Sequence, residues 1–290
     1  MSRRGALLFA AMCVIWGIPY LMIRVAVREL APVTLVFLRT ALAAALLLPL
    51  AVRRDELRPL LAHWRPLLAY TAVEVALPWV LLARAETKLT SSLTGLLIAA
   101  VPLVGGVILA VSGDRERLSG RRWIGLLVGL VGVGAIVGLD FGKIDVVALI
   151  EIALVAVGYA VGPIILARHL KGLAPLGVVA ASLGLSAIVY APLAATHWPS
   201  KLPSEHVIES VIGLAVVCSA AAFLIFFALI AEVGPLRATV ITYVNPAVAA
   251  VLGVALLGEN LTAGMLLGFA LVLLGSVLAT GGSAEAVPEP

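Results

Sequence analysis

The amino-acid sequence predicts an all-α integral membrane protein with ten transmembrane helices, arranged as two inverted five-helix repeats. Hydrophobic residues make up 62% of the chain and charged residues only 12%, whereas a soluble domain carries about a quarter charged residues. Charged clusters and Pro or Gly turns divide the chain into ten apolar stretches, each near the ~20 residues that a helix needs to cross a bilayer. The two halves of the sequence also resemble each other.

The ten apolar stretches have short connections and no β-barrel alternation. We therefore expect helices, because a helix satisfies its backbone hydrogen bonds internally in lipid. The first apolar run follows Arg3 and Arg4 and is too long for a signal peptide, so we expect it to be retained. The expected helices span residues 5–27, 32–52, 66–84, 90–111, 122–140, 146–167, 174–195, 207–231, 236–257 and 262–281.

The positive charges predict the orientation. With the N-terminus in the cytoplasm, the inner loops carry about twice as many Lys and Arg residues as the outer loops, which predicts that both termini are cytoplasmic. The net charge of +4 is then a topology signal and does not indicate a nucleic-acid partner. We expect a multi-pass protein of a bacterial plasma (inner) membrane, with the lipid bilayer as its solvent.

An internal repeat connects the two halves. Pro32 and Pro175 lie 143 residues apart, and Pro49 and Pro192 have the same offset. Because five is an odd number, a first copy that starts inside ends outside, and the second copy enters the membrane upside down. We expect residues 1–142 and 143–281 to form the two repeats, and residues 282–290 to form a disordered cytoplasmic tail.

Several motifs carry a family resemblance. They are Trp16-Gly17, Phe37-Leu-Arg39, and the paired blocks Pro102…Glu116-Arg-Leu and Pro246…Glu259-Asn-Leu-Thr. In this order and spacing, the chain resembles the EamA-type transporters of the drug/metabolite transporter (DMT) superfamily over nearly its whole length. The resemblance implies ten helices around a central cavity, and movement of small metabolites, often amino acids or drug-like compounds and frequently outward. The first copy departs from the pattern, with Gly113-Asp-Arg-Glu-Arg in place of the Gly-Glu block.

Glu74 lies in the middle of an apolar stretch, where an ionisable group usually faces a cavity, a partner or a solute. Two interpretations stay open: a cavity-lining carboxylate that binds an amine or a proton, or a structural carboxylate tied to an Arg. Pro78 has no backbone N–H, so the carbonyl of Glu74 loses its helical partner. Trp79 follows, and it can line a pocket or fill space.

In the first helix, Trp16, Tyr20 and Arg24 share one face because they follow each other at intervals of four residues. This face can stack on a ring and pair a carboxylate, or it can form an interfacial belt with a snorkelling arginine. Pro19 frees a carbonyl of the same helix.

Arg39 in the second helix needs an acidic partner if it is buried. Glu151 is one candidate for this ion pair and Glu74 is another. Glu151 can alternatively form the end of a proton path.

Helices broken by Pro are where transporters build binding sites near the bilayer midplane. Besides Pro19 and Pro78, this pattern singles out Tyr159 with Pro163, Tyr243 and Asn245 with Pro246, and Pro102. The alternative for the nearby hydroxyls is a bond to their own backbone.

Glycines at small-xxx-small spacing in the fifth and tenth helices are typical of close helix packing, within the bundle or between protomers. Glu116 and Glu259 occupy equivalent loop ends, where each favours the start of the next helix through its dipole.

The sequence has no HExxH, GxSxG or Walker motif and no Cys/His cluster, so we expect no enzyme activity, no cofactor and no metal. The preferred function is a secondary active transporter of a small metabolite that works by alternating access, with the proton as one candidate coupling ion. A passive channel and an intramembrane lipid-modifying enzyme are the alternatives. The sequence leaves open whether the chain is a monomer or a homodimer.

Overall fold

The computed structural model describes residues 2–111, 120–138 and 145–280. The expected tail at 282–290 and Glu116 lie outside these residues. The described residues contain helices and no strand, which confirms the all-α class.

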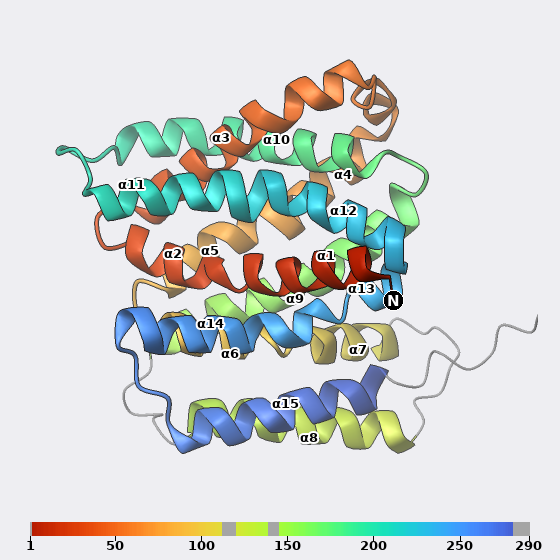
Figure 1. The fold of residues 1–290 in the computed structure, drawn as a ribbon, viewed down its shortest axis with the longest axis vertical. Coiled ribbons are helices and arrows are strands. Elements are labelled where there is room, and N and C mark those ends of the chain that lie inside the picture. The colour runs from red at the N-terminus through yellow and green to blue at the C-terminus, as the bar shows by residue number, and fades with distance from the viewer. Residues whose placement is uncertain (1, 112–119, 139–144, 281–290) are drawn as a thin grey trace, which may run out of the picture.

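The first half of the chain forms five helical segments, the last of which spans residues 120–138 (Figure 1). Three of these segments consist of shorter helices that continue one another. The elements are α1 (Arg3–Ile15), α2 (Ile18–Ala26), α3 (Pro32–Arg53), η1 (Arg58–His63), α4 (Trp64–Tyr70), η2 (Thr71–Ala76), α5 (Leu77–Ala85), α6 (Ser91–Ile98), α7 (Val101–Val111) and α8 (Gly120–Gly138).

The second half follows the same order. Its elements are α9 (Val146–His169), α10 (Pro175–Thr196), α11 (Glu205–Ile212), η3 (Gly213–Ala221), α12 (Ala222–Val233), α13 (Pro235–Ala238), α14 (Ile241–Leu257) and α15 (Ala263–Thr280). Within the described residues, each expected range overlaps one of these segments. The third segment begins at Arg58, earlier than the expected residue 66, because Pro66 lies within the first turn of α4, where a proline is tolerated.

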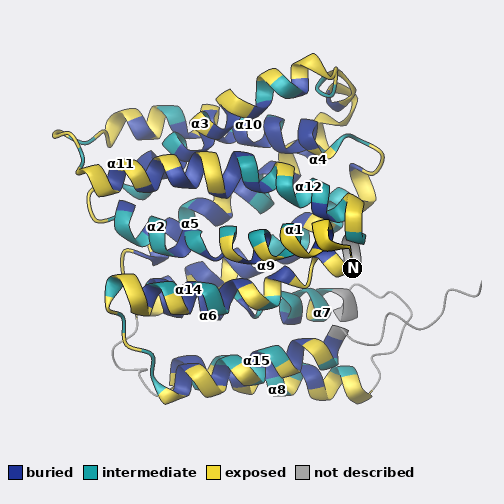
Figure 2. Cartoon of the chain, viewed as in Figure 1, coloured by how far each residue is buried: buried dark blue, intermediate teal, exposed yellow. Residues whose placement is uncertain are grey.

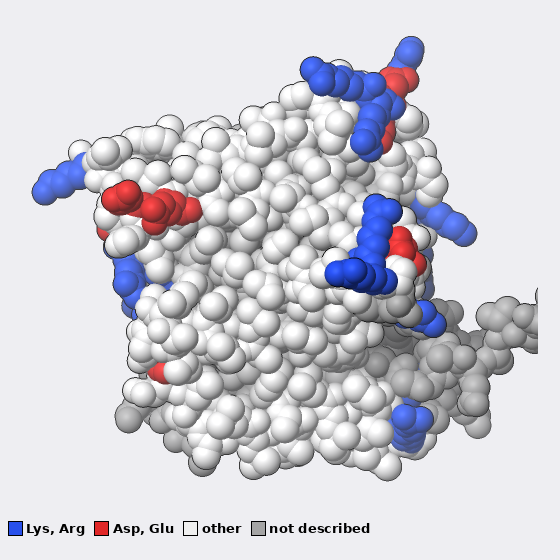
Figure 3. Space-filling view, viewed as in Figure 1, with Lys and Arg blue, Asp and Glu red and all other residues white. Residues whose placement is uncertain are grey.

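Within the described residues, eight helical segments are long and apolar enough to cross a membrane, and Ile241–Leu257 and Ala263–Ala279 are shorter apolar helices. Large apolar side chains such as Leu130 and Leu267 are exposed on the outer faces. Figure 2 shows buried positions where helices face one another and exposed positions on their outward faces. Lys, Arg, Asp and Glu gather at the two ends of the bundle, and the face between them is uncharged (Figure 3). This distribution fits a bilayer around the middle of the bundle.

One end of the bundle is formed by residues 27–31, 86–90, 197–204 and 258–262, on the left in Figure 1. We call it the distal end, because it lies opposite the N-terminus.

Glycines let α8 and α15 approach each other at the bottom of Figure 1. A Cβ atom added at Gly125 would lie 2.5 Å from the Ala279 backbone nitrogen, and one at Gly132 would lie 2.7 Å from the Gly268 carbonyl. The backbones are therefore in direct contact, as small-residue spacing predicts. The same helix pair contains Gly134 and Gly138, which have open space beside them.

Candidate functional site

Arg39 is the centre of a buried polar cluster. It lies on α3 and is only 7% exposed. Its guanidinium carbon lies 3.6 Å from the centre of the Trp79 ring, and its Nε donates to the Ser219 hydroxyl at 2.9 Å. A desolvated arginine–indole contact of this kind contributes about 2 kcal/mol. The arginine therefore joins α3 to α5 and to η3.

Two π-helical segments contain or precede the residues that contact this arginine. The segment η2 ends just before Pro78 and Trp79, where the proline removes a backbone donor. The segment η3 contains Ser219, whose hydroxyl donates to the carbonyl of Leu214, five residues earlier, at 2.8 Å. π-Helical turns are rare and frequently occur at functional sites. The η3 turn thus presents Ser219 to Arg39, and the η2 turn leads into α5, which presents Trp79.

Two tyrosines complete the cluster. Tyr20 on α2 is buried, and it interacts electrostatically with Arg39 and with Tyr159 on α9. The hydroxyl of Tyr159 forms a hydrogen bond with the Trp79 indole. Of the residues that the sequence singled out, the structure thus brings together Arg39, Trp79, Tyr20 and Tyr159.

Glu74 joins the cluster from η2 through Tyr159, with which it interacts electrostatically. Its carboxyl group packs against α9 at Gly162, where an added Cβ atom would overlap Glu74 Oε2. This oxygen is buried and has no hydrogen-bond partner. Gly158, one turn earlier, lets the backbone of Val73 approach α9 in the same way. The carboxyl group is therefore held beside the cluster by packing.

Glu86, a residue that sequence reasoning missed, is the most completely buried carboxyl group of the site. It follows α5, is 0% exposed, and neither carboxyl oxygen has a hydrogen-bond partner. Arg24 on α2 donates to the backbone carbonyl of Glu86. The sequence hid this residue because Arg84 and Lys88 flank it and it resembles a loop charge. The signal was its position directly after an apolar run.

Glu259 has a different role from the expected one. It accepts hydrogen bonds from the backbone nitrogens of Ser91 at 2.9 Å and Ser92 at 2.8 Å, and from both hydroxyls. It caps α6 of the other half, a contact that the sequence does not predict. Burial opposes ionisation, but the bonds from Ser92 and Ser91 outweigh it and lower the pKa of Glu259.

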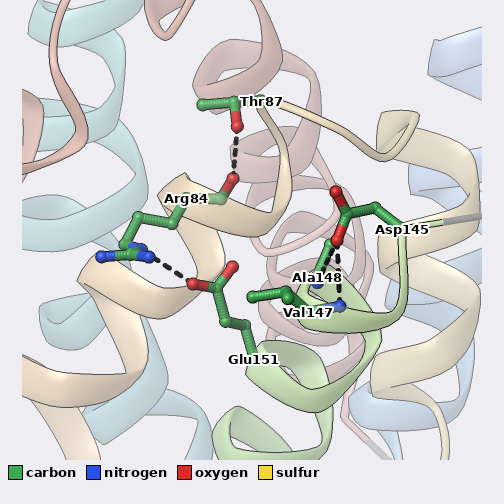
Figure 4. A network of polar contacts seen from close by, with 6 residues as sticks. All are labelled: Arg84, Thr87, Asp145, Val147, Ala148 and Glu151. Atoms are coloured by element: carbon green, nitrogen blue, oxygen red, sulfur yellow. Dashed lines mark hydrogen bonds and ion pairs between the residues drawn. The ribbon is translucent and has the colours of Figure 1, made fainter.

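The expected ion pair between Arg39 and Glu151 is not formed. Glu151 Oε1 accepts from Arg84 Nε at 2.7 Å (Figure 4), and Asp145 caps the same helix by accepting from Val147 at 2.9 Å. The prediction failed because Arg39, once buried, finds an aromatic face and a hydroxyl instead. This network lines a cleft of about 530 Å³ at the distal end, together with Lys88 and His197.

Other candidates lie elsewhere in the bundle. The Trp16 ring packs 4.7 Å from the ring of Phe226 and 5.9 Å from that of Phe223. The Asn245 amide can donate to the carbonyls of Ile241 and Cys13, at 3.0 Å each, which ties α14 to α1. These two side chains are therefore used in helix packing. Tyr243, near Asn245 on α14, is partly buried.

The prolines act in two ways. The helix is interrupted just before Pro19 and just before Pro102. Pro163 and Pro246 lie inside the continuous helices α9 and α14. The breaks expected at these two positions are absent, because a membrane helix can lose one backbone bond to a proline without ending.

Comparison with known proteins places this arrangement in a family. The model of the EamA-like transporter family matches residues 3–138 and again residues 146–281. The chain is 30% identical to the uncharacterized inner membrane transporter YedA of Escherichia coli (strain K12), over 94% of this chain and 89% of YedA. An uncharacterized transporter of Archaeoglobus fulgidus is 24% identical, over 90% of this chain and 92% of its own length.

A solved crystal structure shares the fold with a TM-score of 0.68 at 19% identity, covering 97% of both chains. Together with the two family matches, the relatives show that this chain is a member of the EamA-like transporter family.

Proposed function

We propose that this protein is a secondary active transporter that moves small zwitterionic metabolites, of the amino-acid class, across a bacterial inner membrane by alternating access. The observation that carries the proposal is the cluster of the buried Arg39, Trp79 and Tyr20 with the partly buried Tyr159 and Glu74. Polar and ionisable groups inside a membrane bundle mark substrate and ion pathways.

The chemistry of the cluster favours a zwitterion. The Arg39 guanidinium uses Nε for Ser219 and one face for Trp79, and its remaining N–H groups suit a carboxylate. The Glu74 carboxyl group, whose Oε2 has no partner, suits an ammonium group. Tyr159 interacts electrostatically with both side chains. Aromatic rings at this level suit an apolar or cyclic substrate side chain.

The contacts between helices support two inverted repeats with ten crossings. Helices that correspond in the two halves pack on each other: α3 on α10, α6 on α14, and α8 on α15. Two other contacts are related by the same two-fold symmetry. The α1 segment corresponds to α9 and the α5 segment to α12, and α5 packs on α9 as α12 packs on α1. The family model also matches each half separately. A bundle built in this way can open to either side by rocking one half against the other.

The location rests on the relatives and on the charges. YedA is named an inner membrane transporter, and the end that holds the N-terminus carries Arg3, Arg53, Arg58 and Arg168 in or beside its described helices. Both termini are then cytoplasmic, and the distal end faces outward. Tags at each terminus should be cleaved by protease only in inverted membrane vesicles. Cleavage of one tag in vesicles of the opposite orientation would contradict ten crossings.

Counterflow in proteoliposomes tests the function. Vesicles loaded with a mixture of unlabelled amino acids should transiently accumulate the labelled mixture from outside, which is the signature of an alternating carrier. Ethidium in place of the amino acids tests the drug-like alternative. Equilibration without accumulation would indicate a passive channel, and no uptake of either probe would contradict the proposal.

Matched variants locate the site. Glu74→Gln and Arg39→Gln should each reduce counterflow at least tenfold, because a lost charge partner for a desolvated group costs about 1.4 kcal/mol or more. Glu209→Gln, at an exposed carboxylate on α11, should leave counterflow unchanged. Equal uptake by all four proteins would remove the cluster from the site.

A further inference from the structure

Glu86 has no assigned role, although its surroundings are those of a functional group. The side chain is fully buried, and both carboxyl oxygens lack a donor among the described residues. A buried carboxylate without donors is strongly disfavoured, whereas the same group carrying a proton is tolerated. Burial of this kind therefore favours the protonated form of Glu86.

The charged and titratable groups that face Glu86 come from several elements. Arg24 and Tyr20 lie on α2, Arg39 lies on α3, and Glu259 follows α14. Arg24 donates to the backbone carbonyl of Glu86 and leaves the carboxyl oxygens without a donor. The guanidinium is thus held beside Glu86 and interacts electrostatically with its carboxyl group. A positive charge at that distance is available to stabilise the ionised form once the local packing changes.

Ties between the two halves close the distal end around Glu86. Glu259 of the second half caps α6 of the first half through Ser91 and Ser92. Glu29 accepts from the backbone nitrogen of Ser204 at 2.7 Å and from its hydroxyl at 2.5 Å. These ties must break if the distal end is to open, and water would then reach the space around Glu86.

We propose that Glu86 is a proton-binding residue of the transport cycle, protonated while the distal end is closed and ionised when that end is open. On opening, the O–H bond of Glu86 breaks, the proton passes to water on the distal side, and the carboxylate pairs with Arg24. On closing, the carboxylate takes a proton back from water. This inference rests on the proposed alternating-access function, and it assigns the proton to Glu86 and the substrate ammonium group to Glu74.

The test measures opening directly and needs no substrate. In a Cys13→Ser, Cys218→Ala background, spin labels are placed at Lys88 and Asn260, two exposed positions on opposite sides of the Glu259 tie. The distance between the labels is then measured in liposomes as the pH is raised. In the parent protein, the distance between the two labels should increase as the pH is raised, because ionised Glu86 favours the open distal end.

Glu86→Gln imitates the protonated form and should stay at the short distance at every pH. Glu74→Gln should respond like the parent protein. Arg24→Gln should move the midpoint to higher pH, since the ionised form loses its cation, and a merely structural role of Glu86 would not move this midpoint. Glu86→Asp should restore a pH response, which guards against a folding defect in the glutamine variant.

An unchanged pH response in Glu86→Gln, or no opening of the parent protein at any pH, would overturn the assignment. Failure of the transport function is distinguishable. A Glu86-dependent opening without amino-acid counterflow would refute the substrate proposal and leave the proton site in place. Counterflow whose rate does not change with pH, together with a pH-independent distance, would refute the proton site and leave the transporter.

Discussion

The Glu259 carboxylate accepts hydrogen bonds from the backbone N–H groups of Ser91 and Ser92, so a residue just after α14 caps the beginning of α6. These helices correspond to each other in the two halves of the chain. The contact replaces donors that a helix N-terminus otherwise lacks, and the negative charge also suits the positive end of the helix dipole. These hydrogen bonds therefore connect the two halves of the chain at the distal end.

Glu259→Ala should lower the free energy of unfolding by about 2 kcal/mol, because it leaves several donors of α6 without their charged acceptor. The measurement is the melting temperature of the purified protein in detergent. Glu205→Ala, at an exposed carboxylate in the first turn of α11, is the control and should change the melting temperature much less. Equal melting temperatures for both variants would show that the tie does not stabilise the fold.

The same carboxylate should make stability depend on pH. Its pKa is lowered in the folded protein relative to the ordinary value of 4.5. Its contribution is therefore complete above the unfolded pKa and is lost as the pH falls through the folded pKa. The difference in melting temperature between the parent protein and Glu259→Gln should shrink on acidification. A difference that grows in acid would have the wrong sign for this account.

Gly162→Ala should impair transport more than it impairs folding. The added methyl group overlaps Glu74 Oε2, so the carboxyl group must move away from Tyr159. Counterflow measures the effect, and we expect at least a tenfold loss, as for removal of the charge itself. The control is Gly105→Ala on α7, where an added Cβ atom would meet only Ala160 at 3.9 Å. Equal activity of the two variants would separate Gly162 from the site.

Gly132→Val should separate α8 from α15. The new side chain would collide with the Gly268 carbonyl and the Val272 nitrogen, both 2.7 Å from its Cβ atom, and backbone atoms cannot move aside as a flexible side chain can. We expect a loss of about 3 kcal/mol or more of stability, as for overpacking. Gly134→Val on the same helix has open space and is the matched control. Similar melting temperatures for both would contradict this packing.

The Arg84–Glu151 pair should contribute little, although its N–O distance is 2.7 Å. The Arg84 side chain is 59% exposed, and exposed ion pairs contribute about 0.2–1 kcal/mol. A double-mutant cycle with Arg84→Gln and Glu151→Gln should give a coupling energy below about 1 kcal/mol. A much larger coupling would mean that this pair closes the distal end and does not merely line the cleft.

The sequence predicts the helices well and the polar site only in part. Apolar length and charged boundaries determine where helices lie in lipid, so the expected ranges coincide with the observed segments. The widened turn η2 precedes Pro78, which marks an irregular backbone. The widened turn η3 contains no proline, and no local signal announces it. Its Ser219 is positioned by packing against α3, which depends on the tertiary fold.

Partners of charged residues were the weakest predictions. Arg39 was matched with acids because a buried cation needs compensation, yet an indole face and a hydroxyl supply it. The sequence does not single out Glu86, because an acid between two bases resembles a solvated loop, whereas in the fold its side chain is fully buried. Sequence distance cannot reveal which helices enclose a residue, and burial decides what a carboxyl group does.

Accessibility of Cys218 tests alternating access most directly. This native thiol lies next to Ser219 in η3, is 1% exposed, and interacts with Arg39. In a Cys13→Ser background, a membrane-impermeant maleimide should label it from either side of the membrane. A cross-link that fixes Lys88→Cys to Asn260→Cys should abolish labelling from the distal side alone. Labelling from neither side, or from both sides despite the cross-link, would contradict a site that opens to one side at a time.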